Sequence, residues 1–424
     1  MTAAERVLDH LHPRLALLRG QPAKEAEFWA EVARDGAPLI QPDPTSDAHS
    51  MVTFVWRLPA GAKHVVVQPG FGGAPENVMA LIPGTGVCHA SYRYRRDVRA
   101  SYCFFPDMPL ISWERGNAEE LAELAEFLHG NPPQPDPHHR EHFVSRGYPG
   151  EPDVVTSVLS LPDALDESLV AKRPDVERGW IDKHTFTSQL LGNERNIWVY
   201  TPPGYKHSDH SYSVLVVFDG GNALTQIPVH RMLDNLIADG AIAPVVAVLI
   251  DNATRTSRDN ELPCSESFVR FIETEMLPWL RGGYRVSSAA VDHYVTGASY
   301  GGLASIWMGY RLPHVFGNVI SQAASLWWGP GYKQEVPRGE GGYTPEWLIE
   351  QYDKSPRLPV RFWIEIGLLE PLGLMIAPNR RMQALLQAKG YDVTYREFCG
   401  GHDPALWRAS LAQALEFMLP RPVT

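Results

Sequence analysis

The sequence predicts a two-part α/β protein, in which a largely parallel sheet with helices on both faces follows a smaller β-sandwich. Strands and helices alternate from residue 153 to the end, which is typical of a parallel sheet. Short β-prone runs with Gly and Pro turns fill the first third. The proline-rich stretch 131–152 separates the two patterns and indicates a linker. We therefore place the domains at residues 1–152 and 153–424.

The first part contains two helical stretches and several short strands. Residues 24–34 and 118–128 have helix-forming composition, and turns such as Pro59-Ala60-Gly61 separate runs rich in Val and aromatic residues. The expected strands are 51–58, 63–67, 92–95 and 100–105. Short strands at this spacing predict a small sandwich.

The second part alternates between apolar β-prone runs and longer helical stretches. The expected strands are 195–200, 213–218, 244–250, 291–295, 360–366 and 393–397. The expected helices are 227–239, 267–281, 379–389 and 405–418. This order favours a sheet covered on both faces.

The stretch Gly297-Ala298-Ser299-Tyr300-Gly301 is the strongest chemical signal. It has the G-x-S-x-G pattern, follows an expected strand and leads into residues able to form a helix. Such a turn presents the serine hydroxyl at a helix N-terminus, which is typical of the nucleophile of an α/β-hydrolase. An ordinary glycine-rich turn is the alternative. The context favours Ser299 as the nucleophile.

His402 is the expected general base. In α/β-hydrolases the order along the chain is Ser, acid, His. His402 follows the last expected strand, and two glycines before it allow the loop to fold back toward the sheet. His314, on or just after the elbow helix, suits a solvated or capping role.

Glu370 is the expected acid. It lies just beyond the strand that ends at Ile366, where a carboxylate could orient the imidazole. Glu365 lies inside that strand, and Asp403 is poorly placed to approach the far ring nitrogen. A Ser–His dyad is a further alternative.

Two backbone N–H groups are expected to form the oxyanion hole. One belongs to Tyr300, the residue after the nucleophile. The other is assigned to Gly221, in the loop Phe218-Asp219-Gly220-Gly221-Asn222 that follows a strand. A simple strand-ending turn is the alternative for this loop.

Composition narrows the class of protein. The net charge of −11 argues against nucleic-acid binding, and we find no membrane span or signal peptide, so we expect a cytoplasmic protein. Four scattered Cys fit a reducing compartment. We expect no metal or cofactor, because the His138, His139 and His142 group lacks ligand spacing and is interpreted as solvated.

The residues resemble the enterochelin (enterobactin) esterase family, whose catalytic domain is esterase-D-like. In the second part the resemblance rests on five blocks: Arg195–Pro202, Arg258–Cys264, Ser321–Trp328, Glu365–Pro371 and Gly400–Asp403. In the first part it rests on Phe28-Trp29, Pro38–Ile40, Val52–Arg57 and Arg96–Tyr102. These last blocks resemble the family's N-terminal β-sandwich, which implies an Ig-like domain.

The resemblance implies hydrolysis of the trilactone of a catecholate siderophore such as enterobactin, with iron entering only as part of the substrate. A ferric tris-catecholate is an aromatic trianion, so arginines and aromatic walls are expected to bind it. Arg255 and Arg258 are the best-placed cations, and Arg380 is a weaker candidate. Trp327, Trp328 and Trp407 are the expected walls. The alternatives are an Arg258–Glu261 ion pair and core packing of the tryptophans.

One departure from the family pattern, together with a long loop, leaves the particular substrate open. Ala occurs within Ser321–Ser325 where the family usually has Ser, and a long glycine-rich loop runs from Gly329 to Gly342. An esterase-D-like hydrolase or thioesterase acting on another ester or natural product is the second hypothesis. A protein that binds a siderophore without cleaving it is the third. We expect a monomer or a small homo-oligomer.

Overall fold

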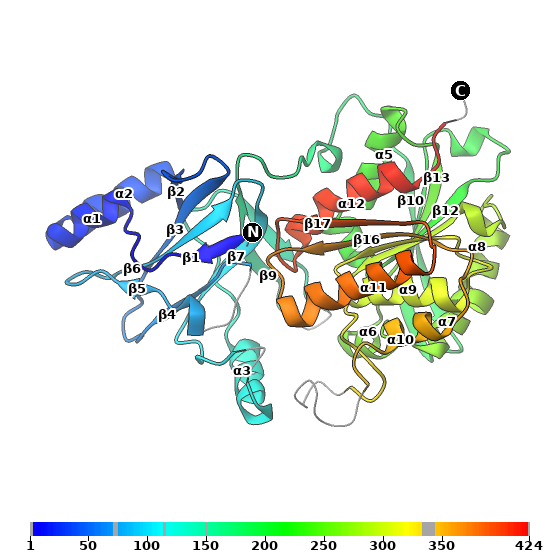
Figure 1. The fold of residues 1–424 in the computed structure, drawn as a ribbon. Helices are drawn as coiled ribbons and strands as arrows, with labels where there is room; N and C mark the ends of the chain where they lie inside the picture. The colour runs from blue at the N-terminus through cyan, green and yellow to red at the C-terminus, as the bar shows by residue number, and fades with distance from the viewer. Residues whose placement is uncertain (1–2, 71–74, 113–115, 149–150, 333–343, 423–424) are drawn as a thin grey trace.

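The computed structural model describes residues 3–70, 75–112, 116–148, 151–332 and 344–422. Figure 1 shows two packed bodies, a β-rich one formed by the first third of the chain and a larger one in which helices surround a long sheet. Among the described residues no helix combines the length and apolarity that a bilayer crossing requires.

Two antiparallel sheets form the N-terminal body. One has the order β1-β6-β3-β2, with β5 on β6, and the other has the order β4-β7-β9-β8. The strands are β1 (Ala4–Arg6), β2 (Leu39–Pro42), β3 (His49–Arg57), β4 (Val65–Gln68), β5 (Ala80–Leu81), β6 (Val87–Arg95), β7 (Arg99–Pro106), β8 (His142–Ser145) and β9 (Val154–Ser160). Side chains from both sheets, including Phe54, Tyr92 and Tyr102, share one core. A two-layer β domain is therefore present, and its Ig-like character stays a prediction.

Three helices cover the outer faces of these sheets. They are α1 (Pro13–Gly20), α2 (Glu25–Asp35) and α3 (Ala118–Gly130). Leu15 of α1 and Trp29 of α2 pack with Val55 of β3. Leu124 of α3 packs with Val66 of β4. Burying the apolar stripe of each helix in this way stabilises both helix and sheet.

The proline-rich stretch 131–152 takes part in the N-terminal body. The backbones of Gln134 and Phe104 exchange two hydrogen bonds of 2.9 and 3.0 Å, and β8 lies within the stretch. β9 pairs with β7 and β8 although it follows the expected boundary at residue 152. The sheets of this body thus extend to Ser160.

Eight strands form the sheet of the larger body, in the order β10-β11-β13-β12-β14-β15-β16-β17. They are β10 (Trp180–Ser188), β11 (Asn193–Thr201), β12 (Ser213–Phe218), β13 (Val245–Ile250), β14 (His293–Ala298), β15 (Asn318–Gln322), β16 (Arg361–Gly367) and β17 (Val393–Phe398). Strands β12 to β17 are parallel, while β10 and β11 pair in the antiparallel sense at one edge. The expected mostly parallel sheet is confirmed, with this mixed edge as a correction.

Helices lie on both faces of the sheet (Figure 1). They are α4 (Gly220–Thr225), α5 (Val229–Ala238), α6 (Arg255–Glu261), α7 (Glu266–Phe271), α8 (Leu277–Gly283), α9 (Tyr300–Arg311), α10 (Trp347–Lys354), α11 (Ala377–Ala388) and α12 (Pro404–Met418). One core joins α5 and α12 to the sheet, through residues such as Leu233 and Leu415. A second core on the opposite face contains Phe268, Trp307 and Met382.

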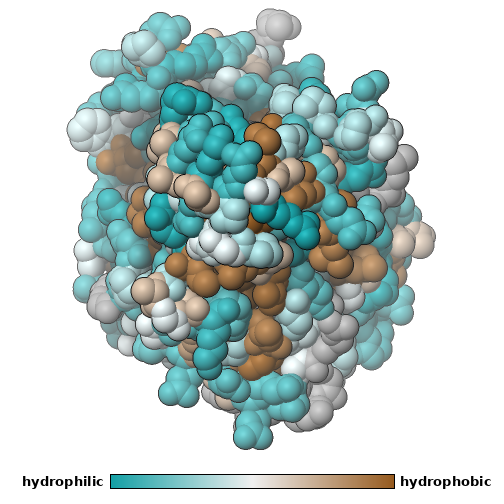
Figure 2. Space-filling model, turned by 90° about the vertical axis from the view of Figure 1, so that its left-hand side faces the viewer, coloured by the Kyte–Doolittle hydropathy of each residue, from teal (hydrophilic) through white to brown (hydrophobic). Residues whose placement is uncertain are grey.

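Figure 2 looks onto the end of the molecule formed by the N-terminal body, where apolar side chains (brown) are divided by hydrophilic ones. The exposed large apolar residues of this body include Leu8, Leu17, Ile40 and Leu81. Scattered exposed apolar residues are ordinary on a protein surface. The oligomeric state stays a prediction.

The two bodies meet at the loops that follow β16 and β17. The Arg99 N–H donates to the Cys399 carbonyl at 2.9 Å, and the Ser101 N–H donates to Asp403 at 3.2 Å. Leu369 and Cys399 belong to the core of the N-terminal body. The expected acid and base therefore lie on loops that the N-terminal body supports.

Candidate active site

Ser299 lies in a strained turn between β14 and α9. Its backbone angles are φ 59° and ψ −118°, a region that a non-glycine residue seldom adopts. A Cβ on Gly297 would lie 2.7 Å from the Gly301 backbone, so only glycine fits the close approach of strand and helix. The geometry is that of a nucleophile elbow.

His402 and Glu370 form a hydrogen-bonded pair. His402 Nδ1 and Glu370 Oε2 lie 2.7 Å apart, and the Glu370 side chain is fully buried while 36% of the His402 side chain is exposed. Burial acts to lower the pKa of His402, but the Glu370 carboxylate outweighs it and raises this pKa above 6.5. Glu370 can thus orient the ring and stabilise its protonated form.

The two alternative acids have other partners. Glu365 accepts hydrogen bonds from Gln322 and Trp363, each at 2.7 Å, in a buried network. Asp403 is the N-cap of α12 and accepts the Ala405 N–H at 2.9 Å. Only Glu370 among these three carboxylates contacts the imidazole.

Ser299 and His402 line one cavity of about 230 Å³ at the carboxyl ends of β12 and β14. In this structure Ser299 Oγ lies 3.3 Å from Ser325 Oγ. The hydrogen bonds of the described residues include none between Ser299 and His402. Sequence reasoning placed Ser325 only in a family block and gave it no role.

The two expected oxyanion donors differ in their surroundings. Tyr300 is the first residue of α9. The backbone N–H groups of the first turn of a helix point along its axis, beyond the N-terminal end. The Gly221 N–H instead donates to Asp251 Oδ1 at 3.2 Å. The Gly221 N–H can donate to an oxyanion only if it gives up its hydrogen bond to Asp251. Both oxyanion roles therefore stay predictions.

Arg258 lines the same cavity, with Asp219 as its partner. Its Nε and Nη2 donate to the two oxygens of Asp219 at 2.7 and 2.9 Å, and its guanidinium lies 5.6 Å from the centre of the Tyr300 ring. Burial opposes the charge, but the Asp219 carboxylate holds the pKa of Arg258 above its usual value. The alternative Arg258–Glu261 pair does not form, because Glu261 binds Arg195 at 2.7 Å.

The other expected cations lie on the surface. Arg255 pairs with Glu151 at 2.9 Å and stacks on Tyr148. Arg380 pairs with Glu397 at 2.6 Å on the outer side of β17. Neither lines the cavity that contains Ser299.

The three tryptophans have different positions. Trp407 lines the cavity, and its ring meets that of His402 edge-on at 4.8 Å. Trp327 is 9% exposed and packs beside the Tyr300 ring, with centroids 6.1 Å apart. Trp328 packs against two apolar cores. Much of the loop 329–342 lies outside the described residues.

The histidines that were interpreted as solvated or capping also have defined places. His314 is exposed and lies 3.1 Å from Glu273. His138 stacks on Trp29, and His139 and His142 bond to backbone carbonyls. His142 is exposed, as a solvated residue should be, whereas His138 and His139 are partly buried because the linker packs against the sheet, so the interpretation as solvated is wrong for those two. Among the described residues no three His, Cys, Asp or Glu side chains are grouped to hold a metal ion.

A strained serine elbow, a His–Glu pair and a shared cavity on a mostly parallel sheet define the chain as a serine hydrolase of the α/β class. Residues 188–418 match the family described as "Putative esterase", and residues 51–169 match "Enterochelin esterase, N-terminal". The chain belongs to the enterochelin esterase family.

Relatives match along nearly the whole chain. The iron(III) enterobactin esterase of Dickeya dadantii is 26% identical, with 95% of each chain covered. The iron(III) salmochelin esterase of Escherichia coli is 24% identical, with 95% of each covered. The crystal structure of the ferric enterobactin esterase from Salmonella typhimurium has a TM-score of 0.74 at 26% identity, and 93% of this chain and 98% of that one are covered.

Proposed function

We propose that this chain is a serine esterase that hydrolyses the trilactone ester bonds of a ferric catecholate siderophore such as enterobactin and so releases the iron. The observation that carries the proposal is the cavity shared by Ser299, His402 and Arg258, on a chain whose two parts both match this family. Crystal structures of the Shigella flexneri enterobactin esterase, one of them in the presence of enterobactin, support the substrate class. Cytoplasmic placement and the lack of a cofactor of its own belong to this proposal.

The reaction follows from the positions of these groups. His402 Nε2 takes the proton of Ser299 Oγ as the oxygen attacks the ester carbonyl. Glu370 holds Nδ1–H, so the far nitrogen is the base. The Tyr300 N–H and a second amide, assigned to Gly221, stabilise the tetrahedral oxyanion. As the intermediate collapses, the protonated His402 gives its proton to the alkoxide oxygen of the substrate, which leaves as a hydroxyl group. Water then hydrolyses the acyl-enzyme by the same route.

Replacing Ser299 tests the chemistry. Ser299→Ala is expected to lower the turnover of ferric enterobactin at least about 10³-fold, because the nucleophile is lost. A fluorophosphonate probe should label the native protein and not this variant. Ser325→Ala is the matched control, which keeps the nucleophile. Unchanged hydrolysis by Ser299→Ala, with folding verified by its melting temperature, would contradict the mechanism.

Arg258 tests the substrate class. Its guanidinium lines the same cavity as Ser299, so it is placed to contact an anionic substrate there. Arg258→Gln should weaken binding of the ferric complex about tenfold or more, with a smaller effect on a neutral aryl ester. Arg380→Gln is the control, since Arg380 lies outside the cavity. Equal losses for charged and neutral substrates would favour another ester.

A further inference from the structure

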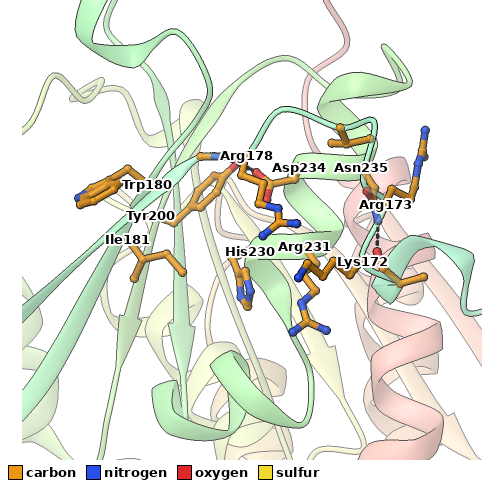
Figure 3. A pocket seen from close by; sticks show the side chains of 13 residues that line it. Lys172, Arg173, Arg178, Trp180, Ile181, Tyr200, His230, Arg231, Asp234 and Asn235 are labelled. Carbon is orange, nitrogen blue, oxygen red and sulfur yellow. Dashed lines mark hydrogen bonds between the residues drawn. The ribbon is translucent and has the colours of Figure 1, made fainter.

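A second cavity, of about 340 Å³, lies between the segment 171–181 and helix α5 (Figure 3). Its lining shares no residue with the cavity around Ser299. Helix α5 separates the two, because Val229 lines the catalytic cavity while His230 and Arg231 line the second one. We call this second cavity the basic cleft.

The walls of the basic cleft are held together by hydrogen bonds. Asn235 of α5 donates to the carbonyls of Leu169 and Ala171 at 2.9 and 3.0 Å. Asp234 accepts the Gly179 N–H at 2.8 Å and the Tyr200 hydroxyl at 2.7 Å. These bonds fix the segment to the helix on both sides of the opening. The cleft is therefore preformed, which lowers the cost of ordering it around a ligand.

Cations predominate in the lining. Arg173 is paired with Asp239 at 2.9 Å, whereas Lys172, Arg178 and Arg231 have no ion-pair partner in the part of the chain that the structure describes. Figure 3 shows Arg178 on the segment and His230 and Arg231 on α5. Unpaired cations gathered in a concave site, on a chain of net charge −11, favour an anionic ligand.

His230 adds a buried ring nitrogen that makes no hydrogen bond among the described residues. Burial, together with Arg231 and Arg178, lowers the pKa of His230 to about 4, so the ring is neutral at pH 7. Its Nδ1 is buried and lacks a hydrogen-bond partner among the described residues. A buried polar atom of this kind calls for a partner.

The rest of the lining is apolar and aromatic. Tyr200 and Val176 are buried within it, Ile181 is partly exposed, and the Trp180 side chain is 61% exposed. Inorganic anions need no such surface. An aromatic ring that carries one acidic group would contact both the cations and the apolar side chains of the cleft.

We propose that the basic cleft binds an aromatic carboxylate, with its acid group at Arg178 and Arg231 and its ring against Ile181 and Tyr200. Each ester bond that the proposed function cleaves frees one carboxylate on a catechoyl amide, so the products belong to this chemical class. The binding itself does not depend on that function.

Calorimetry on the full chain tests this site. The probe is N-benzoylglycine, and Ser299 is first blocked with a fluorophosphonate so that the catalytic cavity is occupied. We expect saturable binding that Arg178→Gln with Arg231→Gln weakens at least tenfold, because two charge-assisted contacts are lost. Arg270→Gln, at an exposed position of α7, is the control and should leave the affinity unchanged. The His230 ring resonances should shift on binding.

Two further binding measurements identify the chemical class of the ligand. The uncharged analogue N-benzoylglycinamide should not bind, and inorganic phosphate should compete only weakly. Equal affinity in the double variant, or binding that disappears when Ser299 is blocked, would overturn the proposal. Strong competition by phosphate would contradict the proposal that the cleft also binds the aromatic ring of the ligand. If the protein failed to hydrolyse trilactones, only the proposed function would be contradicted, because these experiments measure binding and not turnover.

Discussion

The protonation of His402 depends chiefly on the Glu370 carboxylate, with a smaller contribution from Asp403. Glu370 contacts Nδ1 from a fully buried position and raises the pKa of the ring against the effect of burial. A raised pKa means that the protonated ring stabilises the folded state at pH values below about 6.5, its unfolded value. This stabilisation is lost as pH rises through the folded value. In the proposed mechanism His402 acts as the base only above that folded value, where the ring is neutral.

Glu370→Gln is expected to move the acid limb of kcat/KM to lower pH, because the charge that raises the pKa of His402 is removed. The rate should also fall, by about 10²- to 10⁴-fold, since the amide no longer enforces the productive tautomer. The measurement is the pH profile with a neutral aryl ester. Glu365→Gln is the control. An acid limb that moves in the Glu365 variant and not in the Glu370 variant would assign the acid to Glu365.

The positions of the candidate catalytic residues were predictable where each residue follows a strand. Ser299, His402 and Glu370 each follow a strand of the parallel part, and the structure brings the last two into contact. The Arg258–Asp219 pair was missed, because it joins the turn after β12 to helix α6, and the approach of these two segments, 39 positions apart, depends on packing. The Gly221–Asp251 hydrogen bond was missed for the same reason.

At the scale of elements, the β14–turn–α9 unit depends on close backbone contact. Gly297 faces the Gly301 backbone, and a Cβ there would lie 2.7 Å from it. Real Cβ contacts are longer, so the strand or the helix would have to shift. The position of Ser299 is thus tied to a residue that carries no functional group.

Gly297→Ala should destabilise the protein by about 1–3 kcal/mol, as overpacking does, and lower kcat by displacing Ser299. Chemical denaturation and turnover of an aryl ester measure the two effects. The matched control is Gly282→Ala in α8, where a Cβ meets nothing within 4 Å. That variant should be neutral or more stable by up to about 1 kcal/mol. If the two variants behaved alike, the close approach in the elbow would not be limiting.

Much of the element order of the larger body was predictable, because buried strands form continuous apolar runs such as Val214–Phe218. Strands β10 and β15 were not expected from the sequence, and the antiparallel pairing of β10 with β11 was not predictable, since a β-prone run carries no signal for the direction of its partner. The same limit applies to β8 and β9, which belong to the N-terminal sheets although they lie in or after the proline-rich stretch. Partners far away in the sequence decide such assignments.

At the scale of the whole molecule, the N-terminal body supports the loop that carries His402. The Arg99 guanidinium, 6% exposed, donates to the Ala405 carbonyl at 3.1 Å and to Glu141 and Glu167 at 2.8 and 2.6 Å. Arg408 of α12 joins the same carboxylates. Asp403, next to His402, caps α12 and also accepts the Ser101 N–H of β7. His402 is thus positioned by contacts that cross between the bodies.

Arg99→Met is expected to lower kcat for a small neutral aryl ester about tenfold, because the substitution loosens the His402 loop without touching the cavity. Stability should fall by about 2–4 kcal/mol, since Glu141 and Glu167 would then share only Arg408. Arg96→Met is the control, because Arg96 forms a surface pair with Asp163. If the N-terminal body holds the His402 loop in place, kcat should fall for small and large esters alike. If the N-terminal body served substrate binding alone, only the siderophore would be affected, through KM, and the small ester would react at the native rate.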